Sequence, residues 1–238
     1  METIRTYKRR AKASLKNNWG NAAVAMLIIT AIEIGINLVQ TLLFKDSPIL
    51  GMSFQLLASF ILLMPLYWAM NGILLSVTHG EEIKIGRIWY GHHSGNIGRV
   101  LSTIVVFILL VICIHIVAVI PPVAILLLSG ADLISLSSII IIAVFVIVAL
   151  IIAGVYWSMT YFIMWDDARM KNMRAIKAST RMMKGHFWRY FGLCFSFIGW
   201  FILGFISLGV GFLWIIPYLY TAQAHFYEDL KAEQLPQM

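Results

Sequence analysis

Residues 139–165 read IIIIAVFVIVALIIAGVYWSMTYFIMW, a run without a charged side chain. An α-helix rises about 1.5 Å per residue, so a run of this length is long enough to cross the ~30 Å hydrocarbon layer of a bilayer. Trp157, Tyr161 and Trp165 gather toward its second end, and amphipathic aromatic rings favour the boundary between membrane and water. This stretch therefore predicts a membrane-spanning helix.

The composition of the whole chain agrees with that prediction. Of its 238 residues, 61% are hydrophobic and 12% are charged, whereas an average soluble domain is about 25% charged. A soluble fold of this size has too little interior to bury so much apolar surface. We therefore expect an all-α, polytopic bundle of membrane helices that forms a single integral membrane domain over residues 1–238.

The apolar runs predict six transmembrane helices. They cover residues 19–44, 49–78, 100–122, 139–165, 191–206 and 212–227. The third is expected to end at Pro121 and Pro122, because proline lacks a backbone donor and disfavours helix in the residue before it. A polar connection is expected to follow from Ser129 to Ser138.

The last two spans are predicted as a hairpin. Residues 190–224 carry no charge, and as one helix they would be about 52 Å long, far more than one bilayer crossing. Ser207, Gly209 and Gly211 are expected to form the turn.

The basic residues predict the orientation of the chain. Of 18 Lys and Arg residues, all but Lys45 fall in segments on the same side of the predicted spans as the two termini. Short cytoplasmic loops are enriched in Lys and Arg. We therefore expect both termini in the cytoplasm.

Two basic segments, residues 1–18 and 168–185, are expected to form amphipathic helices at the membrane surface. In the first, Tyr7, Ala11 and Leu15 share one face. In the second, apolar residues share one face, and a basic stripe on another consists of Arg174, Lys177, Arg181 and Lys184. This stripe has three interpretations: it fixes topology, it attracts anionic lipid at ~1 kcal/mol per cation, or it binds a partner protein.

Polar residues inside the predicted spans are candidates for a functional site. Glu33 is the only acidic residue well inside a predicted span, and Asn37 lies one helical turn after it. An intramembrane carboxylate either couples to a transported proton or cation, or ties helices together as a neutral, hydrogen-bonded acid. His115 is either bonded to a neighbouring carbonyl or part of a proton relay. Tyr218 and Thr221 are expected to line a polar pocket with the Glu33 face.

The sequence predicts no metal site and no cofactor. The connection after the second span contains five residues that can bind metals, namely His79, Glu81, Glu82, His92 and His93. Their spacing matches no recognised metal-ligand pattern, so we expect them to be solvated loop residues. Cys113 and Cys194 lie in separate apolar runs, where a free cysteine packs as a small hydrophobe.

Short motifs in the last third of the chain resemble a known family. They are residues 175–179 (AIKAS), 183–186 (MKGH), 196–200 (SFIGW), 209–211 (GVG), Trp214, 217–218 (PY) and 226–227 (FY). Together they are similar to the domain-of-unknown-function 975 family of bacterial integral membrane proteins. The resemblance implies a multi-pass protein of the bacterial cytoplasmic membrane and assigns no biochemical activity.

Three classes of function remain open. The first is a non-enzymatic protein that organises lipid, anionic lipid in particular, or a membrane-protein partner or second copy of itself. The second is a small-solute or ion transporter or channel that uses Glu33. The third is an enzyme acting on lipid, for which Asp166 and Asp167 with nearby histidines are the candidates. We favour the first class, and expect no catalytic residue and no nucleic-acid partner.

Overall fold

The computed structural model describes residues 2–130 and 135–234, so residues 131–134 of the predicted polar connection lie outside the described residues. Within these ranges the regular secondary structure is helical and includes no strand, which confirms the all-α class. The helices are α1 (Ile4–Ser14), α2 (Trp19–Leu43), α3 (Pro48–Ala58), the π-helix η1 (Ser59–Leu63), α4 (Met64–Thr78), the 3₁₀-helix η2 (Ile85–His92), α5 (Ser94–Leu128), α6 (Leu136–Trp157), α7 (Thr160–Asp166), α8 (Asn172–Met182), α9 (Phe187–Phe195), α10 (Ile198–Ile206) and α11 (Phe212–Gln234).

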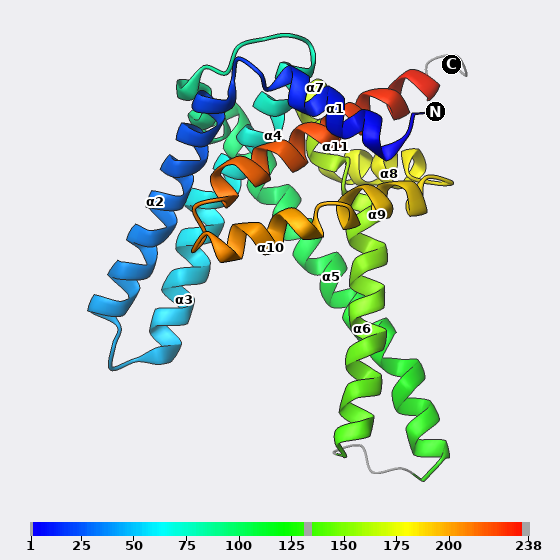
Figure 1. Cartoon of the computed structure of the whole chain (residues 1–238). Coiled ribbons are helices and arrows are strands. Elements are labelled where there is room, and N and C mark those ends of the chain that lie inside the picture. The colour runs from blue at the N-terminus through cyan, green and yellow to red at the C-terminus, as the bar shows by residue number, and fades with distance from the viewer. Residues whose placement is uncertain (1, 131–134, 235–238) are drawn as a thin grey trace.

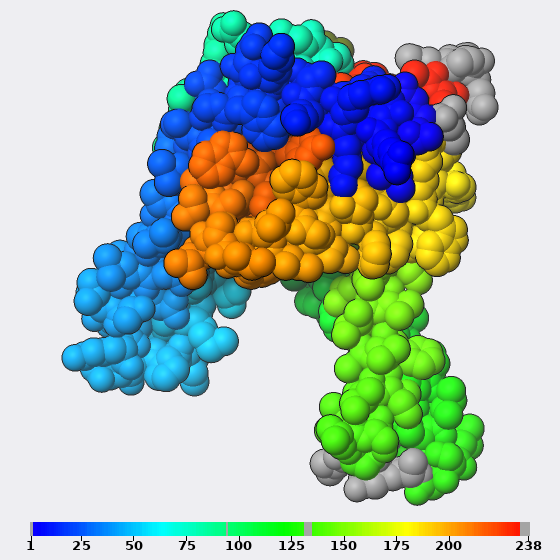
Figure 2. Space-filling model, in the orientation of Figure 1, coloured from blue at the N-terminus to red at the C-terminus, as the bar shows by residue number. Residues whose placement is uncertain are grey.

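Two helical hairpins project from one end of the molecule. Figure 1 shows α2 with α3 on one side and α5 with α6 on the other, while the two termini lie together at the opposite end. In the space-filling view the hairpins separate below the level of α10 (Figure 2). The end with the termini also holds α1 and α8, the two helices formed by the basic segments.

Five helical segments are long and apolar enough to cross a membrane. They are residues 19–43, 48–78, 95–128, 136–166 and 187–206. The first four correspond to the first four predicted spans. In the most apolar window of α5, 11% of the residues are buried inside the molecule. Most of this apolar surface must therefore face a non-aqueous neighbour, as lipid would provide.

Pro65 and the pair Pro121–Pro122 affect their helices differently. Before Pro65 the helix widens into η1, where the amide of Met64 bonds to the carbonyl of Ser59. Pro121 and Pro122 do not end α5, which continues to Leu128; the predicted end at these prolines was wrong. Each proline removes a single backbone donor, and a helix in apolar surroundings tolerates that loss because its other amides have no water to bond to instead.

The predicted C-terminal hairpin forms, and its turn lies at the expected residues. Leu208 and Gly209 have φ values of 53° and 90°, a left-handed conformation that reverses the chain between α10 and α11. In Figure 1 both arms run crosswise to the two projecting hairpins. The first arm lies within the fifth apolar segment, whereas α11 is not among these segments. The six-span count therefore stays a prediction.

Helix α11 lies at the centre of the packed end of the molecule. It packs against α1, α2 and α4, and residues 221–227 are all buried. The large side chains Tyr7, Phe162 and Phe226 of this core are each at most 1% exposed. The basic helices α1 and α8 pack against this core, and their exposed charges lie on its outside.

Candidate functional site at the basic end of the molecule

Helix α8 presents the four cations of the predicted stripe to the outside. Arg174, Lys177 and Arg181 lie on α8 and Lys184 follows its end. All four are exposed, and no side chain among them forms a hydrogen bond or ion pair with another described residue. The opposite face, which includes Ala175, Ile176, Ser179 and Met182, is buried against the protein. The stripe is therefore an uncompensated positive surface.

Ser179 fixes the position of this surface. Its hydroxyl donates to the carbonyl of Tyr156 over 2.7 Å and accepts from the amide of Met159 over 3.2 Å. Both groups lie at the break between α6 and α7, where backbone groups lose their helical partners. The buried Ser179 hydroxyl thus pairs two backbone groups at the break and attaches α8 to the C-terminal end of α6.

Helix α1 buries the face that the sequence predicted to be apolar. Tyr7, Ala11 and Leu15 are 0% exposed, and the helix packs along α11. It therefore covers protein, while Arg5, Arg9 and Lys12 of the helix and Lys16 just after its end are exposed. These four cations also have no hydrogen-bond or ion-pair partner among the described residues.

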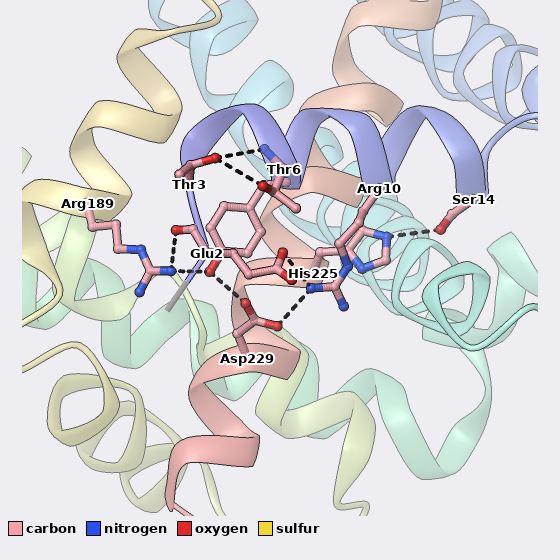
Figure 3. Close-up of polar contacts among 9 residues, drawn as sticks. Glu2, Thr3, Thr6, Arg10, Ser14, Arg189, His225 and Asp229 are labelled. Carbon is pink, nitrogen blue, oxygen red and sulfur yellow. Dashed lines mark hydrogen bonds and ion pairs between the residues drawn. The ribbon is translucent and has the colours of Figure 1, made fainter.

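A network of charged groups docks α1 onto α11 (Figure 3). The Tyr7 hydroxyl donates to Oδ2 of Asp229 over 2.7 Å and accepts from Arg189 over 2.7 Å. Arg10 bridges Oδ1 of Asp229, at 3.0 Å, and Glu2, at 3.1 Å. The guanidinium of Arg189 also lies 5.4 Å from the centre of the Tyr7 ring. Three segments far apart in sequence thus meet around Tyr7 and Asp229.

Burial raises the pKa of the Tyr7 hydroxyl well above its ordinary value of 10.0, and the Asp229 carboxylate raises it further. Both effects disfavour the phenolate, because an anion is poorly solvated when buried and is repelled by a second anion. Tyr7 therefore remains a hydrogen-bond donor at physiological pH.

These docking residues were missed as partners by the sequence analysis. The available signal was Tyr7 on the apolar face of a basic helix, since a buried tyrosine hydroxyl needs a partner. Nothing in the sequence pairs it with Asp229. A second contact of the same kind joins Ser14 Oγ to Nε2 of His225 at 2.9 Å, and His225 is 4% exposed.

The intramembrane candidates Glu33 and Asn37 lie one helical turn apart on α2. Glu33 is half-buried, while Asn37 is exposed and donates to the Glu33 backbone carbonyl. The Glu33 carboxylate forms no hydrogen bond with a described residue.

The other polar candidates have local partners. Nδ1 of His115 lies 2.8 Å from the carbonyl of Val111, one turn earlier. Thr221 is fully buried and donates to the carbonyl of Pro217. The Tyr218 hydroxyl donates to the carbonyl of Lys8 on α1 over 3.2 Å. Tyr218 thus belongs to the contact between α1 and α11.

The candidates for lipid chemistry or metal binding are engaged elsewhere. Asp166 accepts hydrogen bonds from Tyr227 and Lys231. His79 lies 3.3 Å from Glu228. Among residues 2–130 and 135–234, no three His, Cys, Asp or Glu side chains are grouped closely enough to hold a metal ion.

Comparisons with known proteins agree with the resemblance seen in the short motifs and extend it. No curated protein and no solved structure matches this chain. The match to a protein family covers residues 1–234, which includes the first four apolar helices as well as the C-terminal motifs. The chain therefore belongs to the DUF975 family, a family of proteins of unknown function.

Proposed function

We propose that this protein is a multi-pass protein of the bacterial cytoplasmic membrane, with six spans and both termini in the cytoplasm, that gathers anionic lipid around itself and catalyses no reaction. The observation that carries this proposal is the exposed basic stripe of α8, whose four cations have no partner among the described residues. Cations near an anionic membrane surface each contribute ~1 kcal/mol of attraction.

The position of α8 supports the same function. It lies at the end of the molecule that holds both termini and most of the basic residues (Figure 1). It is attached to the α5–α6 hairpin, whose apolar side chains are largely exposed. A lipid molecule beside this hairpin would have its acyl chains against apolar side chains and its headgroup near the stripe.

Native mass spectrometry of the protein released from lipid nanodiscs tests this function. The test variant replaces Arg174, Lys177 and Arg181 with Gln, and the control variant replaces Arg5, Arg9 and Lys16, which removes the same charge from another exposed surface. We expect the wild type and the control to retain several anionic lipids and the α8 variant to lose them. Equal retention by all three proteins contradicts the proposal. Retention of a partner protein instead of lipid by the wild type identifies the stripe as a protein-binding surface.

A second candidate, transport of a proton or cation, is favoured by Glu33. Glu33 is half-buried in an apolar helix, and its carboxylate forms no hydrogen bond with a described residue. Intramembrane carboxylates in such surroundings often mark an ion pathway. In proteoliposomes loaded with a pH-sensitive dye, this function requires a flux in the wild type that Glu33→Gln abolishes and Asn37→Leu preserves.

A further inference from the structure

A pocket of about 320 Å³ opens beneath the end of α1. Its walls come from α1 and the beginnings of α2 and α11, together with α10, and consist of Lys12, Trp19, Trp200, Trp214, Ile215 and Tyr218. In the space-filling view, α10 and the start of α11 (orange) lie directly below the α1–α2 corner (blue) (Figure 2). Four of the six lining residues are aromatic and one is a cation.

The polar groups of this pocket suit an anion. Lys12 contributes an ammonium group, and the three tryptophans contribute indole N–H groups that can only donate hydrogen bonds. None of these four side chains forms a hydrogen bond with another described residue. No carboxylate lines the pocket. A ligand with acceptor groups can pair with these donors, and the charge of Lys12 favours a negative ligand over a cation bound between aromatic rings.

The remaining walls suit a hydrocarbon chain. The Tyr218 ring packs against Trp19, with 6.0 Å between ring centres, and against Trp200, with 5.9 Å. Trp200 and Trp214 are each 44% exposed, and Leu203, one turn beyond Trp200 on α10, is 54% exposed. The apolar wall therefore continues out of the pocket along α10. A free phosphate ion would leave this wall uncovered.

The pocket is held open by contacts behind its walls. The ammonium of Lys8 donates to the carbonyl of Ser196, between α9 and α10, over 2.7 Å and lies 4.5 Å from the Phe197 ring centre. The carbonyl of Lys8 accepts from the Tyr218 hydroxyl. These bonds connect α1 to both arms of the C-terminal hairpin. A binding site built this way needs little ordering when a ligand enters.

The tryptophans and lysine of this pocket indicate that it lies at the membrane–water boundary. Indole rings favour the membrane–water boundary, where lysine side chains also extend toward water. Lys12 belongs to α1, which lies at the end of the molecule with both termini (Figure 1), and the exposed side chains of α10 are apolar. The pocket therefore has a polar end and an apolar end, in the order of a lipid headgroup and its acyl chain.

We propose that this pocket binds a single phospholipid with an anionic headgroup, its phosphate against Lys12 and the indole N–H groups and an acyl chain along Trp200 and Leu203. This inference rests on the proposed function, since it specifies one site for the lipid class that the protein gathers. It differs in its prediction of one firmly held molecule, whereas the α8 stripe attracts several loosely held molecules.

Native mass spectrometry with increasing collision energy tests the pocket. The probes are palmitoyl-oleoyl phosphatidylglycerol and phosphatidylcholine, mixed in equal amounts in nanodiscs. We expect the wild type to retain one phosphatidylglycerol after all other lipid is lost, and Lys12→Gln to lower this retention about tenfold, as loss of a charge-assisted hydrogen bond would. Lys16→Gln is the matched control, because Lys16 is an exposed cation outside the pocket, and it should retain the lipid.

The other outcomes each decide the question. Equal retention of phosphatidylcholine overturns the proposal, because headgroup charge is then not recognised. Protection of the delipidated protein by inorganic phosphate alone, to the same degree as by phosphatidylglycerol, overturns the acyl-chain part and leaves an anion site. Loss of the last lipid from the α8 variant but not from Lys12→Gln overturns the pocket while the proposed function stands. Loss of the last lipid from Lys12→Gln but not from the α8 variant supports the pocket, even if the α8 stripe binds no lipid.

Discussion

The Tyr7 hydroxyl donates a hydrogen bond to Oδ2 of Asp229 over 2.7 Å, although 222 positions separate the two residues in the chain. This bond joins the N-terminal basic helix to the C-terminal part of α11. It lies behind the exposed cations of α1 and, with the contacts of Lys8, determines where Lys12 meets the tryptophans of the pocket.

Removal of this hydroxyl is expected to weaken the docking of α1. Tyr7→Phe should lower the free energy of unfolding by about 1–3 kcal/mol, because Asp229 and Arg189 each lose a partner in a partly buried site. Thermal unfolding in detergent measures the change. The control, Tyr90→Phe, removes an exposed tyrosine hydroxyl without a hydrogen-bond partner among the described residues. It should cost less than about 0.5 kcal/mol. Equal losses in both variants would contradict the assigned role.

The same hydroxyl predicts a dependence of stability on alkaline pH. The pKa of Tyr7 is raised in the folded protein, so the unfolded chain releases this proton first as pH rises. Stability from Tyr7 is fully present below about pH 10 and is lost as pH rises toward the folded pKa. Between pH 10 and 11 the free energy of unfolding of the wild type should fall more steeply than that of Tyr7→Phe, by at most about 1.4 kcal/mol per pH unit. Denaturant titrations at several pH values measure both slopes, and identical slopes would refute this linkage.

Ser179 is predicted to hold the basic stripe in place. Ser179→Ala removes the group that bonds to both Tyr156 and Met159, and leaves two buried backbone groups unpaired at a cost of about 1–3 kcal/mol. Hydrogen exchange followed by mass spectrometry should show faster exchange across α8. Thr180→Ala is the matched control, because the Thr180 hydroxyl bonds within α8 to Ile176. If the two variants exchange alike, Ser179 has no special role.

Gly72 on α4 is predicted to tolerate no side chain. A Cβ atom at this position would overlap the ring of Trp165, and α4 and α7 pack closely at this point. Gly72→Ala should therefore destabilise the protein by about 1–3 kcal/mol, as overpacking does. Gly35→Ala, on α2, is the control, because a Cβ atom there meets no other atom within 4 Å. Unfolding midpoints in detergent compare the two, and an unchanged midpoint for Gly72→Ala would show that Trp165 moves aside at little cost.

Much of the candidate site was predictable because it depends on local patterns. The exposed stripe of α8 and the buried face of α1 follow from helical spacing, since residues three and four positions apart share a face. The pocket was not predictable in this way. Trp19, Trp200 and Trp214 lie in three different helices, and each alone is typical of a membrane–water boundary. Their meeting with Lys12 depends on how four helices pack.

The sequence by itself determined the helical class, the first four apolar spans and the segments between spans in which the cations lie. These properties follow from the length, hydropathy and charge of each segment, whatever its neighbours. The tertiary structure alone decided that α11 becomes the central helix of the core, that Tyr218 bonds to the Lys8 carbonyl, and that Tyr7 docks on Asp229. Such contacts join residues far apart in the chain, and the free energy that selects them comes from packing of whole helix faces, which no local pattern encodes.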